Sequence, residues 1–407
     1  MKKVHIIDLF AGCGGLLEGF EQSGHYSTLA CVEWEKDPCL NLIKHLKDRW
    51  KYCDAEKMVL RFDIQRYKEL FNGWQDPQYG TSDGLDNLIQ HKSVDLIVGG
   101  PPCQAYSVAG RVRDKDGMRH DYRNYLFESY IEVVKHYKPK AFIFENVPGI
   151  LSARPNEGLI IEQIQKSFDD AGYTIISDLK DAVIDMSDYG VPQNRKRVII
   201  LGLSKNIYSK TAQKILKDFY EKVLPSYKCK KKTTVFDAIH DLPPLYPLEH
   251  PSNTNRLSHT TVESKYYNHT PRWHSLRDIK IFQLLAKDQA DGNGNYKSTS
   301  ALKELYTTVT GRVSNVHKYH VLDWNECSNL IPAHLHKDGL RHIHPDFNQA
   351  RSITVREAAR LQGFPDDYIF IGPTMSQYKM IGNAVPPIFS KILADAVYKL
   401  LFNEKKG

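Results

Sequence analysis

The stretch Gly99-Gly100-Pro101-Pro102-Cys103-Gln104-Ala105-Tyr106-Ser107 follows Val94-Asp95-Leu96-Ile97-Val98, an apolar run of strand length. Paired glycines and prolines cannot continue a helix, and they stiffen the backbone where the strand ends. The pattern therefore predicts that Cys103 lies at the carboxyl end of a parallel strand, where open α/β sheets place their chemistry. Taken alone, such a cysteine is more often a buried, inert thiol in a turn, and only the surrounding motifs favour a reactive one.

The composition bounds the class of protein. The chain has 407 residues, of which 41% are hydrophobic and 25% charged, as in folded soluble proteins. No apolar run reaches membrane-spanning length, and Asp8 interrupts the first apolar stretch, so we expect neither a membrane segment nor a signal peptide. Seven cysteines without a Cys-x-x-Cys pair predict no disulfide framework and no metal site, and they fit a reducing cytoplasm.

The charge is mildly basic, with a net +7 that permits a polyanionic partner without requiring one. Part of the excess positive charge is concentrated in one segment, because residues 205–232 contain nine lysines, interleaved with aromatic residues. This segment is interpreted either as the solvated face of one or two helices or as a surface that contacts phosphates.

The N-terminal segment predicts a strand over 4–10, followed by the glycine turn Ala11-Gly12-Cys13-Gly14-Gly15 and a helix from Leu16 to about Gln22. A second strand, 26–32, ends in Glu33-Trp34, about 20 residues beyond the turn. An acid at this position in such folds binds ribose hydroxyls, although Glu33 is alternatively an ordinary loop carboxylate. Trp34 offers a face for adenine, and Asp63 offers a further acid at a strand end. The segment 72–84 is predicted to be a surface loop or an insertion.

Polar residues also follow the later strands. The strand 141–147 carries Glu145 and Asn146 at its tip, next to the predicted position of Cys103, so these groups would converge on one pocket. Arg195 and Arg197 precede another strand, and their period-two spacing places both on one face, as anion clamps or as edge charges. The charged segment 105–121, with Arg111 and Arg113, is a candidate mobile lid or a solvated loop.

Alternating strands and helices from residue 4 to about 203 predict an α/β fold with a doubly wound sheet. Residues 245–350 are rich in His, Asn, Thr and Tyr and show no clear period, which predicts a second, smaller domain of short irregular elements. Regular structure returns with a helix over 354–362, capped by Thr354, and a closing helix from Ile388 to about Phe402.

These motifs together resemble, in order and over nearly the whole chain, the DNA cytosine-5 methyltransferase family. The matching segments are 8–15, Glu33, Asp63, 99–107, 145–147, 193–197, 351–366 and 382–386. Tyr106 is a mild departure, since phenylalanine is usual there. The irregular region falls where the family carries its target-recognition domain. The resemblance implies a Rossmann-like S-adenosylmethionine-binding domain over 1–240, completed by 376–407, and a target-recognition domain over 241–375.

The resemblance also implies the site. Cys103 would be the nucleophile that adds to cytosine C6, Glu145 would bond the N3 and amino edge, and Arg195, with Arg197 beside it, would orient the carboxylate or the base. The S-adenosylmethionine contacts would be Asp8, Phe10, Gly12, Gly14, Gly15, Glu33, Trp34, Asp63, Ile64, Pro101, Leu126, Asn383 and Val385. The DNA contacts would be Gln104, Ser107, Arg111 and Arg113, and the cytosine would be flipped out of the duplex.

The partners implied are double-stranded DNA and a cognate restriction endonuclease, with the chain acting as a monomer in the cytoplasm. Two alternatives stay open. One keeps the chemistry on tRNA, as in a related branch of the family, and the other is a non-catalytic DNA-binding relative. The complete set Cys103, Glu145 and Arg195 argues against the second alternative.

Overall fold

A computed structural model describes residues 3–102, 125–154, 158–252, 254, 256–261, 265–313 and 318–402. The chain divides into two compact units. The first draws on Met1–Tyr189, Arg195–Lys230 and Ala384–Gly407, and the second on Gly190–Asn194 and Lys231–Asn383. The unit boundaries thus fall at 230 and 383, where the sequence predicted 240 and 375.

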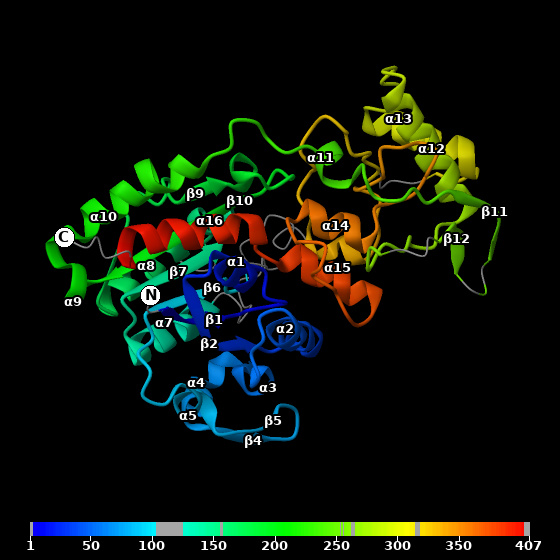
Figure 1. Cartoon of the computed structure of the whole chain (residues 1–407). Coiled ribbons are helices and arrows are strands. Elements are labelled where there is room, and N and C mark those ends of the chain that lie inside the picture. Colours follow the sequence, from blue (N-terminus) through cyan, green and yellow to red (C-terminus); the bar gives the residue numbers. More distant parts are fainter. Residues whose placement is uncertain are drawn as a thin grey trace. The chain divides into compact units, whose positions relative to one another are not determined.

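A twisted sheet organises the first unit (Figure 1). Its strand order among the described residues is β3-β2-β1-β6-β7-β10-β8, with β9 paired to β10. The strands are β1 (Val4–Leu9), β2 (Tyr26–Glu33), β3 (Val59–Arg61), β6 (Leu96–Gly99), β7 (Ala141–Asn146), β8 (Tyr173–Ile175), β9 (Val183–Asp185) and β10 (Lys196–Ser204).

Neighbours from β3 to β7 pair in parallel, whereas β10 is antiparallel to β7, β8 and β9. The central strands are almost entirely buried, which is why they are continuous apolar runs rather than alternating patterns. Leu9 pairs with Gly99, and Gly99 pairs with Phe144, so the carboxyl ends of these three strands share one edge. The prediction of a doubly wound sheet is confirmed.

Helices follow the strands as expected of crossover connections. In the first unit they are α1 (Gly15–Ser23), α2 (Lys36–Asp48), α3 (Ala55–Met58), α4 (Tyr67–Asn72), α5 (Gly84–Ile89), α7 (Leu126–Tyr137), α8 (Ile160–Asp170), α9 (Lys205–Tyr208), α10 (Ala212–Asp218) and α16 (Pro387–Val397).

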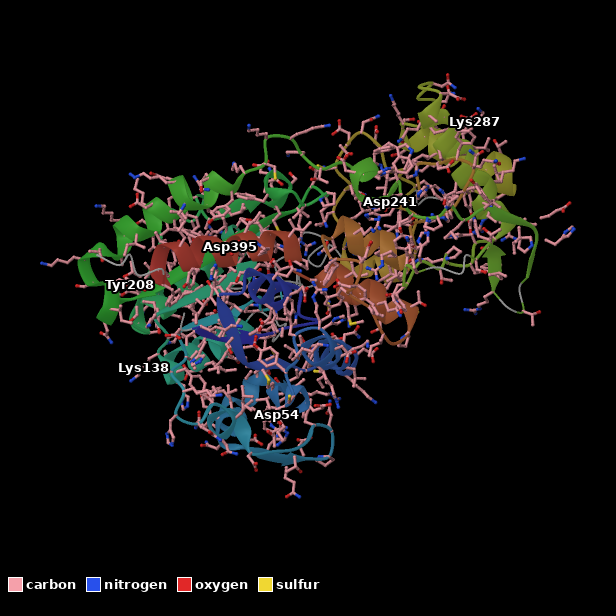
Figure 2. All side chains as sticks on the ribbon, viewed as in Figure 1. Asp54, Lys138, Tyr208, Asp241, Lys287 and Asp395 are labelled. Atoms are coloured by element: carbon pink, nitrogen blue, oxygen red, sulfur yellow. The ribbon has the colours of Figure 1, made fainter. Side chains whose placement is uncertain are left out.

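The closing helix α16 packs against α1, although the two are separated by most of the chain (Figure 1). A Cβ on Gly19 of α1 would clash with the backbone N of Lys391 and with Ser390, so only glycine permits this approach. Asp395, labelled in Figure 2, pairs with Lys391 at 3.0 Å within α16. The N-terminal glycine turn and the C-terminal helix therefore belong to one packed unit.

The segment 72–84, which the sequence predicted to be a surface loop or an insertion, has regular structure. It contains a hairpin of β4 (Trp74–Asp76) and β5 (Gly80–Ser82), and Trp74 stacks on Phe62 with ring centroids 4.0 Å apart. The side chain of Asp76 accepts hydrogen bonds from the backbone N–H groups of Gln78 and Tyr79 and so forms the turn. The turn residues were read as a loop because strands of three residues leave little periodic signal.

The lysine-rich segment forms α9, α10 and short helical turns. Four of its nine lysines pair with carboxylates, namely Lys205 with Asp169, Lys217 with Glu221, Lys222 with Asp218 and Lys228 with Asp188. Such neutralising pairs are typical of a solvated helix face, which they favour over the phosphate-binding alternative.

The second unit is more regular than predicted. Its elements are α11 (Val235–Ile239), β11 (Pro247–Ser252), β12 (Leu257–His259), α12 (Leu276–Ala290), α13 (Thr299–Thr310), the short helix η8 (Ala333–His336), α14 (Val355–Leu361) and α15 (Thr374–Asn383). Ser275 and Ser298 cap α12 and α13 by accepting from the N–H groups of Asp278 and Ala301. The apolar faces of both helices were too diluted by polar residues to show as a period.

A buried ion pair anchors α14. Arg351 donates to both oxygens of Glu357, at 2.6 and 2.7 Å, and both side chains are fully buried. Glu357 also accepts from the N–H of Thr354, whose hydroxyl accepts from the N–H of Glu357. This capping box confirms the predicted role of Thr354 and ties the helix start to the ion pair.

Four histidines of the second unit are held neutral by burial. Desolvation lowers the pKa of His259 to about 4, and it lowers the pKa of His274, His342 and His344 to about 3. In the unfolded chain the pKa of each returns to about 6.5. Between these values the unfolded state binds more protons than the folded state, so acid destabilises the unit.

We expect the free energy of unfolding of this unit to fall steadily from pH 6.5 towards pH 4. By linkage, each such histidine contributes about 1.4 kcal/mol per pH unit within that window. His342→Leu should remove about one proton from those taken up on unfolding, because the pKa of His342 is about 3 in the folded unit. Thermal unfolding followed across pH measures this, and a His342→Leu protein with the wild-type pH slope would contradict the interpretation.

Candidate active site

A glycine turn joins β1 to α1 at the carboxyl edge of the sheet. Phe10, Gly12 and Gly14 all have positive φ, at 56°, 56° and 85°. The N–H of Ala11 reaches the carbonyl of Val32 at 3.1 Å, which holds the turn against the tip of β2. A non-glycine residue such as Phe10 in this conformation is strained, and strained backbone is concentrated at functional sites.

Glu33 fastens this turn from the second strand. Its Oε2 accepts from the N–H of Gly12 at 2.9 Å, and its Oε1 accepts from the N–H groups of Trp34 and Glu35. Burial raises the pKa of Glu33, and the three backbone hydrogen bonds oppose that rise. Trp34, 48% exposed, lies beside this carboxylate. Glu33, the predicted ribose contact, therefore touches the glycine turn, and Trp34 is its neighbour in the chain.

Two further acids lie near the same edge. Asp63 caps a short helical turn by accepting from the N–H of Gln65 at 3.0 Å, and Ile64 behind it is buried. Asp8, on β1, is fully buried, and its Oδ2 has no hydrogen-bond partner among the described residues. Burial, reinforced by Glu33, raises the pKa of Asp8 well above its ordinary value.

The remaining predicted cofactor residues divide between the units. Pro101 follows β6, Leu126 begins α7, and Val385 precedes α16; all three are buried in the first unit. Gly15 begins α1. Asn383 ends α15, is exposed, and belongs to the second unit.

An ion pair occupies the tip of β7. Glu145 Oε1 lies 2.9 Å from Arg197 Nε, and both side chains are about nine-tenths buried. A Cβ placed on Gly100 would lie 2.6 Å from Glu145 Oε2, so only glycine leaves room for this carboxylate. Next to it, Asn146 donates to the carbonyl of Pro101 at 3.3 Å. The segment that leads into Pro102 and Cys103 is thus in contact with the tip of β7.

The two arginines have different positions. Arg197 pairs with Glu145. The sequence assigned Arg195 to orient the carboxylate or the base, with Arg197 beside it, and the role of Arg195 towards the base stays a prediction. Arg195 is fully buried, and its Nη2 donates to the carbonyl of Ala384 at 3.0 Å, before α16. The strand register explains why Arg197 meets Glu145. Ile199 of β10 pairs directly with Glu145, and Arg197 lies two residues before Ile199, on the same face of β10. Arg195 lies before the first residue of β10, Lys196. The expectation that alternate residues of one strand share a face therefore does not apply to Arg195.

Several predicted residues lie outside the described part of the chain. These are Cys103, Gln104, Ser107, Arg111 and Arg113, together with the lid segment 105–121. Gly100 was not singled out from the sequence, although the Gly-Gly pair was a signal of close approach. In the part of the chain that the structure describes, no group of His, Cys, Asp or Glu side chains is arranged to hold a metal ion, and no helix is long and apolar enough to cross a membrane.

A glycine turn, a carboxylate at the tip of the second strand and a buried ion pair lie at the carboxyl edge of this doubly wound sheet. This arrangement is typical of α/β enzymes, which bind their ligands at that edge. The model of the family described as "C-5 cytosine-specific DNA methylase" matches residues 4–399. The chain therefore belongs to this family, and it is a DNA cytosine-5 methyltransferase.

Individual relatives agree with this assignment. The type II methyltransferase M.Bpa9945I of Bacillus paralicheniformis is 37% identical over 453 residues, which cover 96% of this chain and 98% of the relative. The type II methyltransferase M1.HphI of Haemophilus parahaemolyticus is 31% identical, with coverage of 98% and 87%. A solved structure described as a prophage-encoded DNA modification methyltransferase (E. coli) aligns with a TM-score of 0.60 at 23% identity over 98% of this chain and 99% of that one, which shows the common fold.

Proposed function

We propose that this chain transfers the methyl group of S-adenosylmethionine to C5 of a cytosine within a specific duplex DNA sequence, using Cys103 as the nucleophile. The observation that carries the proposal is the buried Glu145–Arg197 pair, 2.9 Å apart, packed against Gly100 three residues before Cys103. A carboxylate fixed by a guanidinium beside a cysteine is what attack on a cytosine ring requires.

The described residues fit S-adenosylmethionine. The turn at Gly12 and Gly14 has positive φ and carries no side chain that would keep a ligand from its backbone. Glu33 and Trp34 present a carboxylate and an indole face, and the buried Asp8 carboxyl has an oxygen without a hydrogen-bond partner among the described residues. Those residues, with Phe10, Asp63, Ile64, Pro101, Leu126 and Val385, would hold it, and the contact of Asn383 stays a prediction from the sequence. When bound, this cofactor supplies an electrophilic methyl group on a sulfonium.

The glycine turn gives a direct test of that assignment. An alanine at position 14 would have to adopt φ of 85° with its Cβ 2.6 Å from Leu42 Cδ1, so we expect Gly14→Ala to weaken S-adenosylmethionine binding about tenfold or more. Gly24→Ala carries a similar φ, 74°, with nothing within 4 Å, and should lower stability by about 1 kcal/mol without changing affinity. Calorimetric titration and thermal unfolding separate the two effects. Wild-type affinity in Gly14→Ala would contradict the assignment.

The catalytic residues would act in sequence on the base. Cytosine C5 is a poor nucleophile until the Cys103 thiolate adds to C6 and makes the ring enamine-like. Glu145 would bond N3 and the amino group and favour protonation of N3 as charge develops. Arg197 would keep the Glu145 carboxylate in place throughout. Once C5 carries the methyl group, its proton passes to solvent, the electrons of that C–H bond form the C5–C6 double bond, and the C6–sulfur bond breaks to release the Cys103 thiolate. N3 then returns its proton to Glu145, which restores the aromatic ring.

A stacked cytosine is out of reach of such a site, so the base would be flipped out of the duplex. The segment 105–121, with Gln104, Ser107, Arg111 and Arg113, remains our candidate for contacting the DNA around that base. The second unit would read the target sequence. The type II relatives further support a restriction–modification role, in which a cognate endonuclease is the partner, and we infer a monomer in the cytoplasm.

Base-resolution bisulfite sequencing of a plasmid from cells that express the chain tests the function. Protected cytosines confined to one short motif, and absent from a Cys103→Ser control, are the expected result. A folded protein that binds S-adenosylmethionine but protects no DNA cytosine would contradict the proposal. Methylation of tRNA by the same preparation would then identify the RNA alternative.

A further inference from the structure

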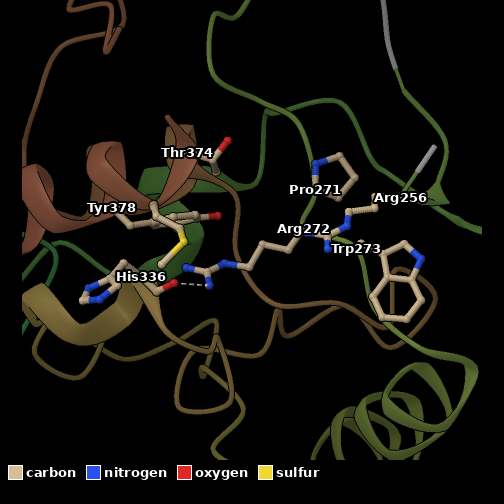
Figure 3. A pocket seen from close by; sticks show the side chains of 8 residues that line it. Arg256, Pro271, Arg272, Trp273, His336, Thr374 and Tyr378 are labelled. Carbon is tan, nitrogen blue, oxygen red and sulfur yellow. Dashed lines mark hydrogen bonds between the residues drawn. The ribbon is translucent and has the colours of Figure 1, made fainter. Parts of the chain in front are cut away.

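The second unit contains a cavity of about 610 Å³ (Figure 3). It is lined by Arg256, Pro271, Arg272, Trp273, His336, Thr374, Met375 and Tyr378. Figure 3 shows Arg272 reaching towards His336 and Tyr378, while Arg256 lies beside Pro271 and Trp273. The volume exceeds what a single inorganic ion fills and is in the range of sites for organic ligands.

The charge of this cavity is uncompensated. Two of its described lining residues are arginines, and none is an aspartate or glutamate. Arg272 donates to the backbone carbonyls of Leu335 and His336, and its guanidinium lies 3.8 Å from the ring centroid of Tyr378. Carbonyls and a ring face orient a guanidinium but carry no formal negative charge.

Arg272 also hydrogen-bonds the Tyr378 side chain, and one of its donors lacks an acceptor in the part of the chain that the structure describes. Its Nε is buried and has no hydrogen-bond partner among the described residues. Burying a charged donor without an acceptor costs free energy of folding. A guanidinium group matches the geometry of phosphate oxygens, which could supply that acceptor. Arg256, by contrast, is exposed. One fixed and one accessible guanidinium in a single cavity suit a phosphodiester that arrives from solvent.

The apolar side of the cavity suits the sugar attached to such a phosphate. Trp273 is 38% exposed and Met375 is 60% exposed. Large apolar side chains that face solvent beside arginines are typical of surfaces that bind a nucleic-acid strand. Thr374 adds a hydroxyl at the start of α15.

We propose that this cavity, the Arg256–Arg272–Trp273 pocket, binds one nucleotide of the DNA strand, with its phosphate between the arginines and its deoxyribose against Trp273. The inference rests on the proposed function, because it assumes a DNA substrate. The proposed contact is with the sugar-phosphate backbone of the DNA rather than with the edge of a base. The pocket therefore contributes affinity and register, and it contributes nothing directly to the choice of sequence.

The salt dependence of binding to a short fluorescein-labelled DNA duplex, followed by anisotropy, tests this. Each phosphate contact contributes about 0.9 to the slope of log K against log salt. Arg256→Gln should weaken binding several-fold on every duplex and reduce that slope by about one, while Arg256→Lys retains the slope. Trp273→Ala should weaken binding with the slope unchanged, since it removes no charge.

Arg312→Gln is the matched control, because Arg312 is an exposed arginine of the same unit outside the cavity. If the slope of log K against log salt changes equally in Arg256→Gln and Arg312→Gln, or changes in neither variant, the proposed phosphate contact in the pocket is wrong. The proposal would also be wrong if millimolar inorganic phosphate binds in an Arg256-dependent way while the salt slope of DNA binding is the same with and without Arg256. That result would identify a site for an isolated ion. A wild-type protein that binds no duplex DNA would instead contradict the proposed function.

Discussion

Replacing Glu145 with glutamine is expected to lower kcat by about 100- to 10,000-fold. Glutamine has nearly the same shape and still accepts a hydrogen bond from Arg197, so the tip of β7 should keep its geometry. It cannot, however, supply the proton or the negative charge that cytosine N3 needs during attack. Single-turnover transfer of a radiolabelled methyl group measures the loss, and affinities for DNA and for S-adenosylmethionine should change little.

The matched control is Glu132→Gln on α7, where a partly exposed carboxylate pairs with Lys135 at 2.9 Å. It makes the same chemical change at a residue that is not a predicted site residue, and it should leave kcat unaltered. Gly100→Ala is a second probe, because its Cβ would displace Glu145 Oε2. If S-adenosylmethionine binding fails in Glu145→Gln while the fold persists, the carboxylate belongs to the cofactor site instead.

Cys103→Ser should abolish transfer, with a loss of about four orders of magnitude or more. A serine hydroxyl is scarcely ionised near neutral pH and is a much weaker nucleophile than a thiolate, so the first bond to C6 does not form. DNA binding should persist, because the exchange of sulfur for oxygen changes neither charge nor size appreciably.

The control for this variant is Cys229→Ser, an exposed cysteine of the first unit, which should be fully active. A second readout avoids reliance on activity alone. Duplex DNA with 5-fluorocytosine retains the C6–sulfur bond, since fluorine cannot leave as a proton does. A denaturation-resistant adduct should therefore form with the wild type and not with Cys103→Ser. Turnover near the wild-type rate in Cys103→Ser would exclude Cys103 as the nucleophile.

The sheet could be predicted from the sequence because buried parallel strands are uninterrupted apolar runs that end in glycine or an acid. Glu33 and Glu145 were found in this way, since a polar residue directly after such a run is conspicuous. The cap at Thr354 was found from local chemistry alone. Each of these signals is contained within a few consecutive residues.

What could not be predicted depends on pairing between distant segments. The choice between Arg195 and Arg197 depends on the register of β10 against β7, which no local pattern encodes. Gly100 is recognisable as essential only once Glu145 lies beside it. The Arg256–Arg272–Trp273 pocket likewise combines residues from a hairpin turn, an extended segment and the start of α15, more than 100 residues apart.

The packing of α16 on α1 through Gly19 has a consequence for synthesis on the ribosome. Most of the sheet strands are translated within the first half of the chain, but the helix that covers α1 is translated nearly last. Until residues 387–397 emerge, the α1 surface that receives them stays open to solvent. The nascent chain consequently cannot complete its first unit before the second unit has been made, so an enzyme that modifies DNA would become competent only when both parts exist.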